Sequence, residues 1–140
     1  IDKKNIELDE KLSRTEVADN LERLIEAVGN YLLEGYSFKH YKPSGGIYEV
    51  HRLENLPVDL NIRGNSYYRD RKYGHLSYVD IKIADSDDLD EKKDQIIELF
   101  EKINQRVSDL NGKTGEEMIE MARQSQVKEA IRKELTMYLL

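Results

Sequence analysis

The strongest constraint on the fold is an alternation of apolar and polar residues in the middle of the chain. Residues 58–62 and 78–83 each place an apolar side chain at every second position. Because successive side chains of a strand point to opposite faces, each stretch predicts a strand with one buried face and one solvated face. The connecting segments are shorter than the crossovers that parallel strands need, so we expect an antiparallel meander.

Further strands are predicted on the N-terminal side of this pair. Residues 36–42 and 47–52 flank the segment 43–46, whose proline and glycines are typical of a turn, and together they predict a hairpin. Apolar residues at alternate positions within 5–12 predict one more strand near the start of the chain.

Three helices are predicted from capping sequences and from apolar residues three and four positions apart. The first begins at a capping box formed by Ser13 and Glu16, and it ends at Gly35. Its apolar stripe comprises Val17, Leu21, Leu24, Ile25, Val28 and Leu32. A second capping box, from Thr114 to Glu117, opens the last helix, in which a break is expected near Ser125.

The helix between these two carries a seam like that of a coiled coil. After the acidic run 85–91, apolar residues recur at spacings of four, three, four and three, at Ile96, Phe100, Ile103, Val107 and Leu110. Two heptads are too few for a stable isolated coil, so packing on the chain's own sheet is favoured. The alternative is a homodimer formed through the C-terminal helices, assisted by the apolar end 137–140.

Together these elements predict one α+β domain over residues 1–140. Its core, residues 1–83, comprises the N-terminal strand and helix and the antiparallel β-meander, and residues 84–140 supply C-terminal helices packed on one face of the sheet. A chain of 140 residues is long enough to bury a core without metals or crosslinks.

The opening stretch from Lys3 to Leu24, a charged strand followed by a capped helix, resembles the start of the small prokaryotic amphi-Trp domains. The resemblance covers the first strand and helix only, because this chain has no tryptophan and its C-terminal helices have no counterpart in that family. It implies a strand, a helix and then further strands. It implies no functional residue, since the family has no established activity.

The composition limits where the protein works. The chain has no cysteine, which excludes disulfides and thiolate metal sites and favours the reducing cytoplasm. Its apolar runs are far shorter than the ~20 residues that span a bilayer, and no charged and then apolar leader opens it. We therefore expect neither a membrane span nor a signal peptide. Because the chain begins with Ile1, we also expect that preceding residues have been removed.

The sequence predicts no catalytic residue, no metal and no cofactor, and hence no enzyme. The acidic run 85–90 lacks the glycine and the glutamate that an EF-hand requires, so helix capping is the preferred interpretation. His40, His51 and His75 could converge on a metal, but they lack close spacing and cysteine partners, and ordinary surface or boundary histidines are expected. No serine stands in a nucleophile elbow, and no glycine-rich loop precedes a helix.

The middle third of the chain holds the candidate binding residues. Residues 36–83 carry eight basic and five acidic groups and seven of the nine tyrosines, whereas the flanking segments are acidic. Tyrosine and arginine dominate interface energetics, so we expect binding through the sheet edge and loop 63–78. The candidate residues are Arg63, Tyr67, Tyr68, Arg69, Arg71, Lys72, Tyr73 and Tyr78.

A non-enzymatic module that binds a protein partner is the leading interpretation. Nucleic-acid binding by the same loop is the alternative, because phosphates attract arginine and bases stack on tyrosine. Against it, we expect a neutral solvent face on the sheet, with Lys39, Arg63 and Lys82 balanced by Glu49, Asp59 and Asp80. A third interpretation is that the acidic helices imitate a phosphate backbone, as small phage or mobile-element inhibitors of nucleic-acid enzymes do.

Overall fold

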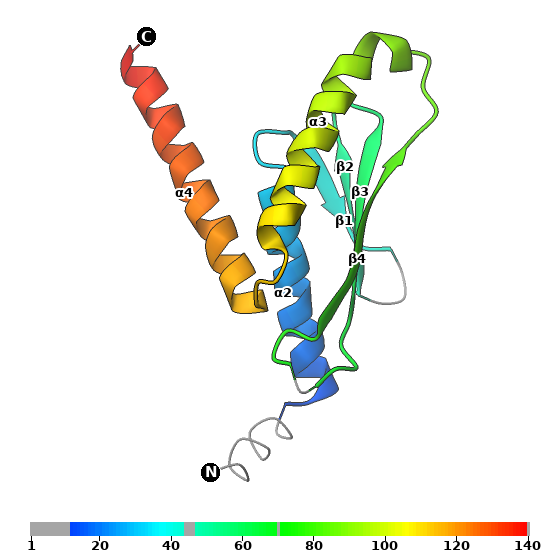
Figure 1. Ribbon diagram of the computed structural model, residues 1–140, viewed down its shortest axis with the longest axis vertical. Helices are drawn as coiled ribbons and strands as arrows, with labels where there is room; N and C mark the ends of the chain where they lie inside the picture. The colour runs from blue at the N-terminus through cyan, green and yellow to red at the C-terminus, as the bar shows by residue number, and fades with distance from the viewer. Residues whose placement is uncertain (1–11, 44–46, 70, 140) are drawn as a thin grey trace.

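The computed structural model describes residues 12–43, 47–69 and 71–139 (Figure 1). Its elements follow in the order α2 (Arg14–Leu32), β1 (Phe38–Tyr41), β2 (Tyr48–Leu53), β3 (Val58–Asn65), β4 (His75–Ile83), α3 (Leu89–Leu110) and α4 (Gly115–Leu139). A helix, a sheet and two C-terminal helices make up the predicted α+β fold, which is confirmed. The strand predicted at 5–12 lies outside the described residues, apart from Leu12.

The four strands form one antiparallel sheet in the order β1-β2-β3-β4, which is the predicted meander. Leu60 at its centre pairs with His51 of β2 and with Ile81 of β4, and residues paired in this way point to the same face. We call this face the inner face and the opposite one the outer face. Val58, Leu60 and Ile62 are each at most 1% exposed, as their alternation predicts.

Helix α2 lies against the inner face of the sheet. It begins at the predicted capping box, where the Glu16 amide donates to Ser13 Oγ at 3.1 Å and the Ser13 amide donates to Glu16 Oε2 at 2.9 Å. All six residues of its predicted apolar stripe are buried. Helix and strand approach closely because Gly64 of β3 has no Cβ, which leaves room for the Leu21 side chain.

Helix α3 packs in the same core as α2 and the inner face of the sheet, so it packs in cis as predicted. Its buried residues are Ile96, Leu99, Ile103 and Leu110. The predicted seam was wrong at Val107, which is 40% exposed, and it missed Leu99, which is fully buried. Phe100 is half-buried and packs against the core as predicted. A strict heptad repeat suits a supercoiled partner, while a single helix on a sheet follows the ordinary 3.6-residue period.

Helix α4 packs along α2, on the same side of the sheet (Figure 1). It begins at the predicted capping box, but it runs without a break through Ser125, contrary to the prediction. The Ser125 hydroxyl bonds the Glu34 carboxylate and accepts from Arg106 Nη1 at 3.0 Å. Because these partners lie outside α4, the hydroxyl does not compete with the backbone of its own helix.

The second half of α4 projects away from the other elements (Figure 1). Val127, Ile131 and Leu135 lie there at a spacing of four and are 46%, 51% and 57% exposed. This stripe is where the predicted homodimer contact would lie, and dimerisation stays a prediction; the apolar end 137–140 lies outside the described side chains. None of the described helices has an apolar stretch long enough to cross a membrane.

Candidate binding surface and a buried polar cluster

The outer face of the sheet carries tyrosine and arginine side chains, and no described helix lies over it (Figure 1). The rings of Tyr48 and Tyr78 lie 6.4 Å apart between centroids. The Arg52 guanidinium lies 5.2 Å from the Tyr41 ring and donates to both carboxylate oxygens of Asp59, at 3.0 and 3.2 Å. Such two-point pairing holds the guanidinium in one orientation, so part of this aromatic surface is preorganised.

The prediction that this face is neutral was wrong, because Glu49 points to the other side of the sheet. Glu49 pairs with Ile62, whose side chain is in the core, and only 3% of the Glu49 side chain is exposed. The outer face therefore has two more cations than carboxylates. The cations are Lys39, Arg52, Arg63 and Lys82, and the carboxylates are Asp59 and Asp80.

The base of the β3–β4 loop is fixed by hydrogen bonds. Asn65 Oδ1 accepts from the Tyr67 amide at 2.8 Å, and Asn20 Nδ2 of α2 donates to the Lys72 carbonyl at 3.0 Å. Gly74 has φ of +66°, in the left-handed region that favours glycine, and it turns the chain into β4. Because these contacts fix the base of the loop, less conformational entropy is lost when the loop binds a partner.

The tip of this loop presents two exposed tyrosines. Tyr67 is 73% exposed and its ring lies 5.7 Å from the Arg14 guanidinium at the start of α2. Tyr68 is 48% exposed and its ring lies 5.3 Å from that of His75. Large aromatic groups in this position contribute contact area without first being withdrawn from the core.

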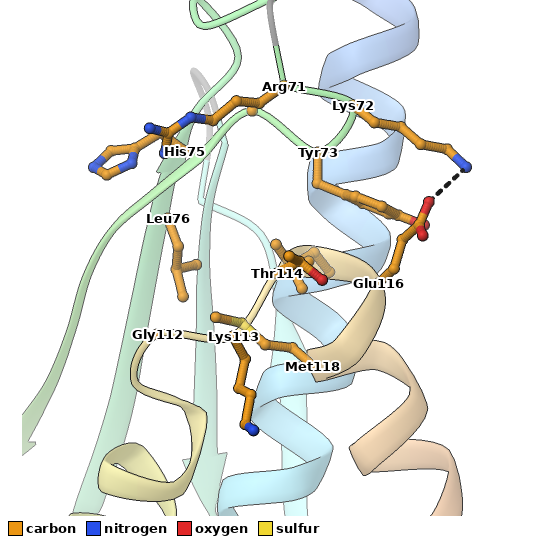
Figure 2. Close-up of a pocket in the computed structure, with 13 residues that line it drawn as sticks. Arg71, Lys72, Tyr73, His75, Leu76, Gly112, Lys113, Thr114, Glu116 and Met118 are labelled. Carbon is orange, nitrogen blue, oxygen red and sulfur yellow. Dashed lines mark hydrogen bonds and ion pairs between the residues drawn. The ribbon is translucent and has the colours of Figure 1, made fainter.

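A cavity of about 650 Å³ lies between the β3–β4 loop and the turn that joins α3 to α4 (Figure 2). Its apolar lining comes from Leu24, Tyr73, Leu76 and Met118. The Tyr73 ring packs on Gly115, where a Cβ would lie 2.8 Å from the ring. At one side Lys72 Nζ lies 3.4 Å from Glu116 Oε1. Three cations and one carboxylate line the cavity, so it suits an apolar side chain flanked by an anionic group.

The structure divides the eight predicted binding residues into three groups. The outer face holds Arg63 and Tyr78, the loop tip holds Tyr67, Tyr68 and Arg69, and the cavity wall holds Arg71, Lys72 and Tyr73. Figure 2 shows the Arg71 and Lys72 side chains pointing in opposite directions, with Lys72 directed to α4. Sequence reasoning missed Tyr41 and Tyr48, whose outward positions follow only from the strand register.

Three polar side chains lie together on the inner face, near the edge formed by β1. The sheet pairs His40 with His51, and Glu49 lies two residues before His51 on β2, so all three point to the same face. His40 Nε2 lies 2.8 Å from Glu49 Oε2, and the two imidazole rings are 4.8 Å apart between centroids. One metal-ligating atom from each residue lies within 4.8 Å of the other two.

His51 is fully buried, and neither of its ring nitrogens has a hydrogen-bond partner among the described residues. A buried polar group without a partner costs about 1–3 kcal/mol, so an imidazole in this position requires a physical explanation. Burial, followed by repulsion from a charged His40, lowers the pKa of His51 to about 4. The ring is therefore neutral at pH 7.

The expectation of surface or boundary histidines was wrong for His51, and the three histidines do not converge. His75 lies at the other end of the sheet, on the outer face, and Glu49 completes the cluster instead. The missed signal is Gly29, an isolated glycine within a helical pattern, which usually has a packing reason. A Cβ at Gly29 would lie 2.2 Å from His51 Nε2.

The acidic run before α3 does not cap that helix in the predicted way. Asp88 occupies the N-cap position without a side-chain hydrogen bond to the backbone of the first turn. Its carboxylate instead accepts from the Ser86 hydroxyl and pairs with Lys92 Nζ at 3.0 Å, and these contacts lower the pKa of Asp88. Asp90 and Glu91 in the first turn still interact favourably with the helix dipole.

Comparison of the chain with models of known protein families, with curated proteins and with solved structures gives no match. The resemblance of residues 3–24 to the amphi-Trp domains therefore stays a prediction. Function is accordingly inferred from the charges, exposures and contacts of the described residues.

Proposed function

We propose that this protein is a non-enzymatic module that binds a protein partner through residues 63–78 and the adjoining outer face of the sheet. The observation that best supports this is the exposure of Tyr41, Tyr67, Tyr68 and Tyr78, which ranges from 41% to 73%. Tyrosine supplies a large contact area at low entropic cost, and it is among the residues most enriched at binding hot spots. The lack of cysteine favours the cytoplasm as the place of binding.

The partner that fits this surface is a segment with an apolar side chain beside acidic groups. The cavity behind the loop offers an apolar lining of suitable size for such a side chain. Arg69 and Arg71 are exposed at the loop, and Arg71 also lines the cavity. Carboxylates of the partner can therefore pair with guanidinium groups while its apolar side chain enters the cavity.

Simultaneous replacement of Tyr67, Tyr68, Arg69 and Arg71 with alanine is expected to lower the recovery of the bound protein at least about tenfold, because single hot-spot residues each contribute about 2 kcal/mol or more. All four side chains are exposed, so the fold is expected to persist. The measurement is quantitative affinity purification from cells, with circular dichroism to verify folding.

A control variant shortens four exposed side chains, two of them cationic, elsewhere on the surface. Alanine at Ile97, Val107, Arg123 and Lys128 deletes two exposed apolar groups and two cations from α3 and α4. This variant is expected to recover the partner as the unaltered protein does. Equal recovery by the loop variant and the unaltered protein would rule out binding through residues 63–78.

Single-stranded nucleic acid is a second candidate ligand, favoured by the charge of the outer face. With Glu49 on the inner face and Arg52 paired to Asp59, three cations remain on the outer face against one carboxylate. The neighbouring Tyr48 and Tyr78 rings supply surfaces on which bases stack.

The test is a mobility-shift assay with single-stranded RNA or DNA. If the protein contacts three phosphates, a rise in salt from about 50 to 200 mM is expected to reduce affinity about twentyfold. The variant Arg63→Ala is expected to weaken binding. It is also expected to lower the slope of log affinity against log salt concentration by the amount that corresponds to about one phosphate contact. Arg123→Ala on α4 is the matched control and is expected to change neither. Absence of a shift at the lower salt concentration would remove nucleic acid as a candidate.

A further inference from the structure

We propose that His40, Glu49 and His51 form a binding site for a divalent transition-metal ion, with Zn²⁺ as the preferred ion. The site lies on the inner face of the sheet, where β1 and β2 pair. The site is separate from the outer face and the β3–β4 loop, so the metal-binding proposal does not depend on the proposed partner binding.

The positions of the ligand atoms are compatible with a single ion. Ligands about 2.0–2.2 Å from a tetrahedral Zn²⁺ lie roughly 3.3 Å from one another. His40 Nε2 and Glu49 Oε2 are already 2.8 Å apart, and the set of three lies within 4.8 Å. We therefore expect small rotations of the His40 and Glu49 side chains to place all three ligand atoms around one ion, with the buried His51 ring held in place.

The buried His51 side chain gives an independent reason to place a ligand here. A neutral imidazole has a lone pair on one ring nitrogen, and neither nitrogen of His51 has a partner among the described residues. Coordination supplies a partner to a nitrogen that otherwise has none. Two imidazoles and one carboxylate favour Zn²⁺ over Ca²⁺ and Mg²⁺, which prefer oxygen ligands.

The proposed metal site is open to solvent on one side and enclosed by protein on the other. His40 belongs to the edge strand β1, and 35% of its side chain is exposed, so a water molecule can occupy the fourth coordination position. The backbone of α2 at Gly29 and the Phe38 ring, 5.4 Å from the His51 ring, enclose the opposite side. Metal ligands must be unprotonated, so we expect binding to weaken as the pH falls.

The test is a calorimetric titration of the tag-free, chelator-treated protein with ZnCl₂ at pH 7. We expect one Zn²⁺ per chain, and we expect His40→Ala and Glu49→Gln each to weaken binding at least about tenfold. Glu49→Gln keeps the size of the buried side chain, so it serves if His40→Ala does not fold. His75→Ala removes a histidine from the outer face and is expected to bind as the unaltered protein does.

Titration with Co²⁺ adds a readout of geometry, because tetrahedral coordination gives a strong visible absorption that weak surface binding does not. We expect this absorption in the unaltered protein and in His75→Ala, and we expect its loss in Glu49→Gln. Absence of stoichiometric Zn²⁺ binding would overturn the proposal. Equal affinity of Glu49→Gln and the unaltered protein would also overturn it, since the ion would then lie elsewhere, for example at the acidic run 85–90.

Discussion

Acidification from pH 7 to pH 4 is expected to lower the free energy of unfolding by about 3 kcal/mol through His51 alone. The pKa of His51 falls from 6.5 to about 4 on folding because burial, and then repulsion from His40, disfavours the imidazolium. Between these two values the unfolded chain binds a proton that the folded chain does not. Protonation of His51 therefore does not reduce the free energy of unfolding above about pH 6.5. The reduction grows as the pH falls from there toward 4.

Urea unfolding at several pH values, followed by circular dichroism in the presence of a chelator, measures this loss. Among the described residues, the His51 ring lies near the titratable groups His40 and Glu49, the Phe38 ring and the α2 backbone at Gly29. His51→Leu cannot gain a proton, so its stability is expected to fall about 3 kcal/mol less over this range. His75→Ala, altered at an exposed position, is expected to match the unaltered protein. A fall of the same size in His51→Leu would contradict the prediction.

Gly29→Ala is expected to destabilise the protein by about 2 kcal/mol, although alanine is about 1 kcal/mol better than glycine in a helix interior. The added Cβ would lie 2.2 Å from His51 Nε2 and 2.4 Å from His51 Cε1. The His51 ring is fully buried, so it has little space into which to move. Either the ring leaves its rotamer or α2 moves away from the sheet, and both disturb the core.

A double-mutant cycle separates this contact from a general intolerance of alanine at position 29. In a His51→Ala background the ring is absent, and Gly29→Ala is then expected to stabilise the protein by about 1 kcal/mol through helix propensity. The sign of the effect therefore changes with the residue at position 51. The same destabilisation in both backgrounds would show that the His51 ring is not the obstacle.

The parts of the fold that follow from local chemistry could be predicted from the sequence. The capping boxes at Ser13 and Thr114 each satisfy backbone amides within four residues, so no distant contact is needed to recognise them. The alternation in 58–62 could also be recognised from the sequence. It is regular because β3 is an inner strand with one face packed against α2. Strand order then followed from the short connections.

The parts that depend on register between strands could not be predicted. In β2 an outward-facing Val50 and the inward-facing Glu49 and His51 reverse the usual pattern, so alternation alone gives the wrong face. Only the pairing with Leu60 and Ile62 identifies the inner side. The polar cluster, and with it the true charge of the outer face, was hidden for this reason.

The order β1-β2-β3-β4 also bears on how the chain reaches its folded state. Each strand pairs with the next one along the chain, across a connection of at most nine residues. Closing such short loops has a small entropic cost, so the sheet can assemble hairpin by hairpin without a long-range search. On the ribosome, residues 38–83 emerge before α3 and α4, so the four strands can pair before those helices are complete. Early pairing shortens the time during which the edges of unpaired strands are open to aggregation.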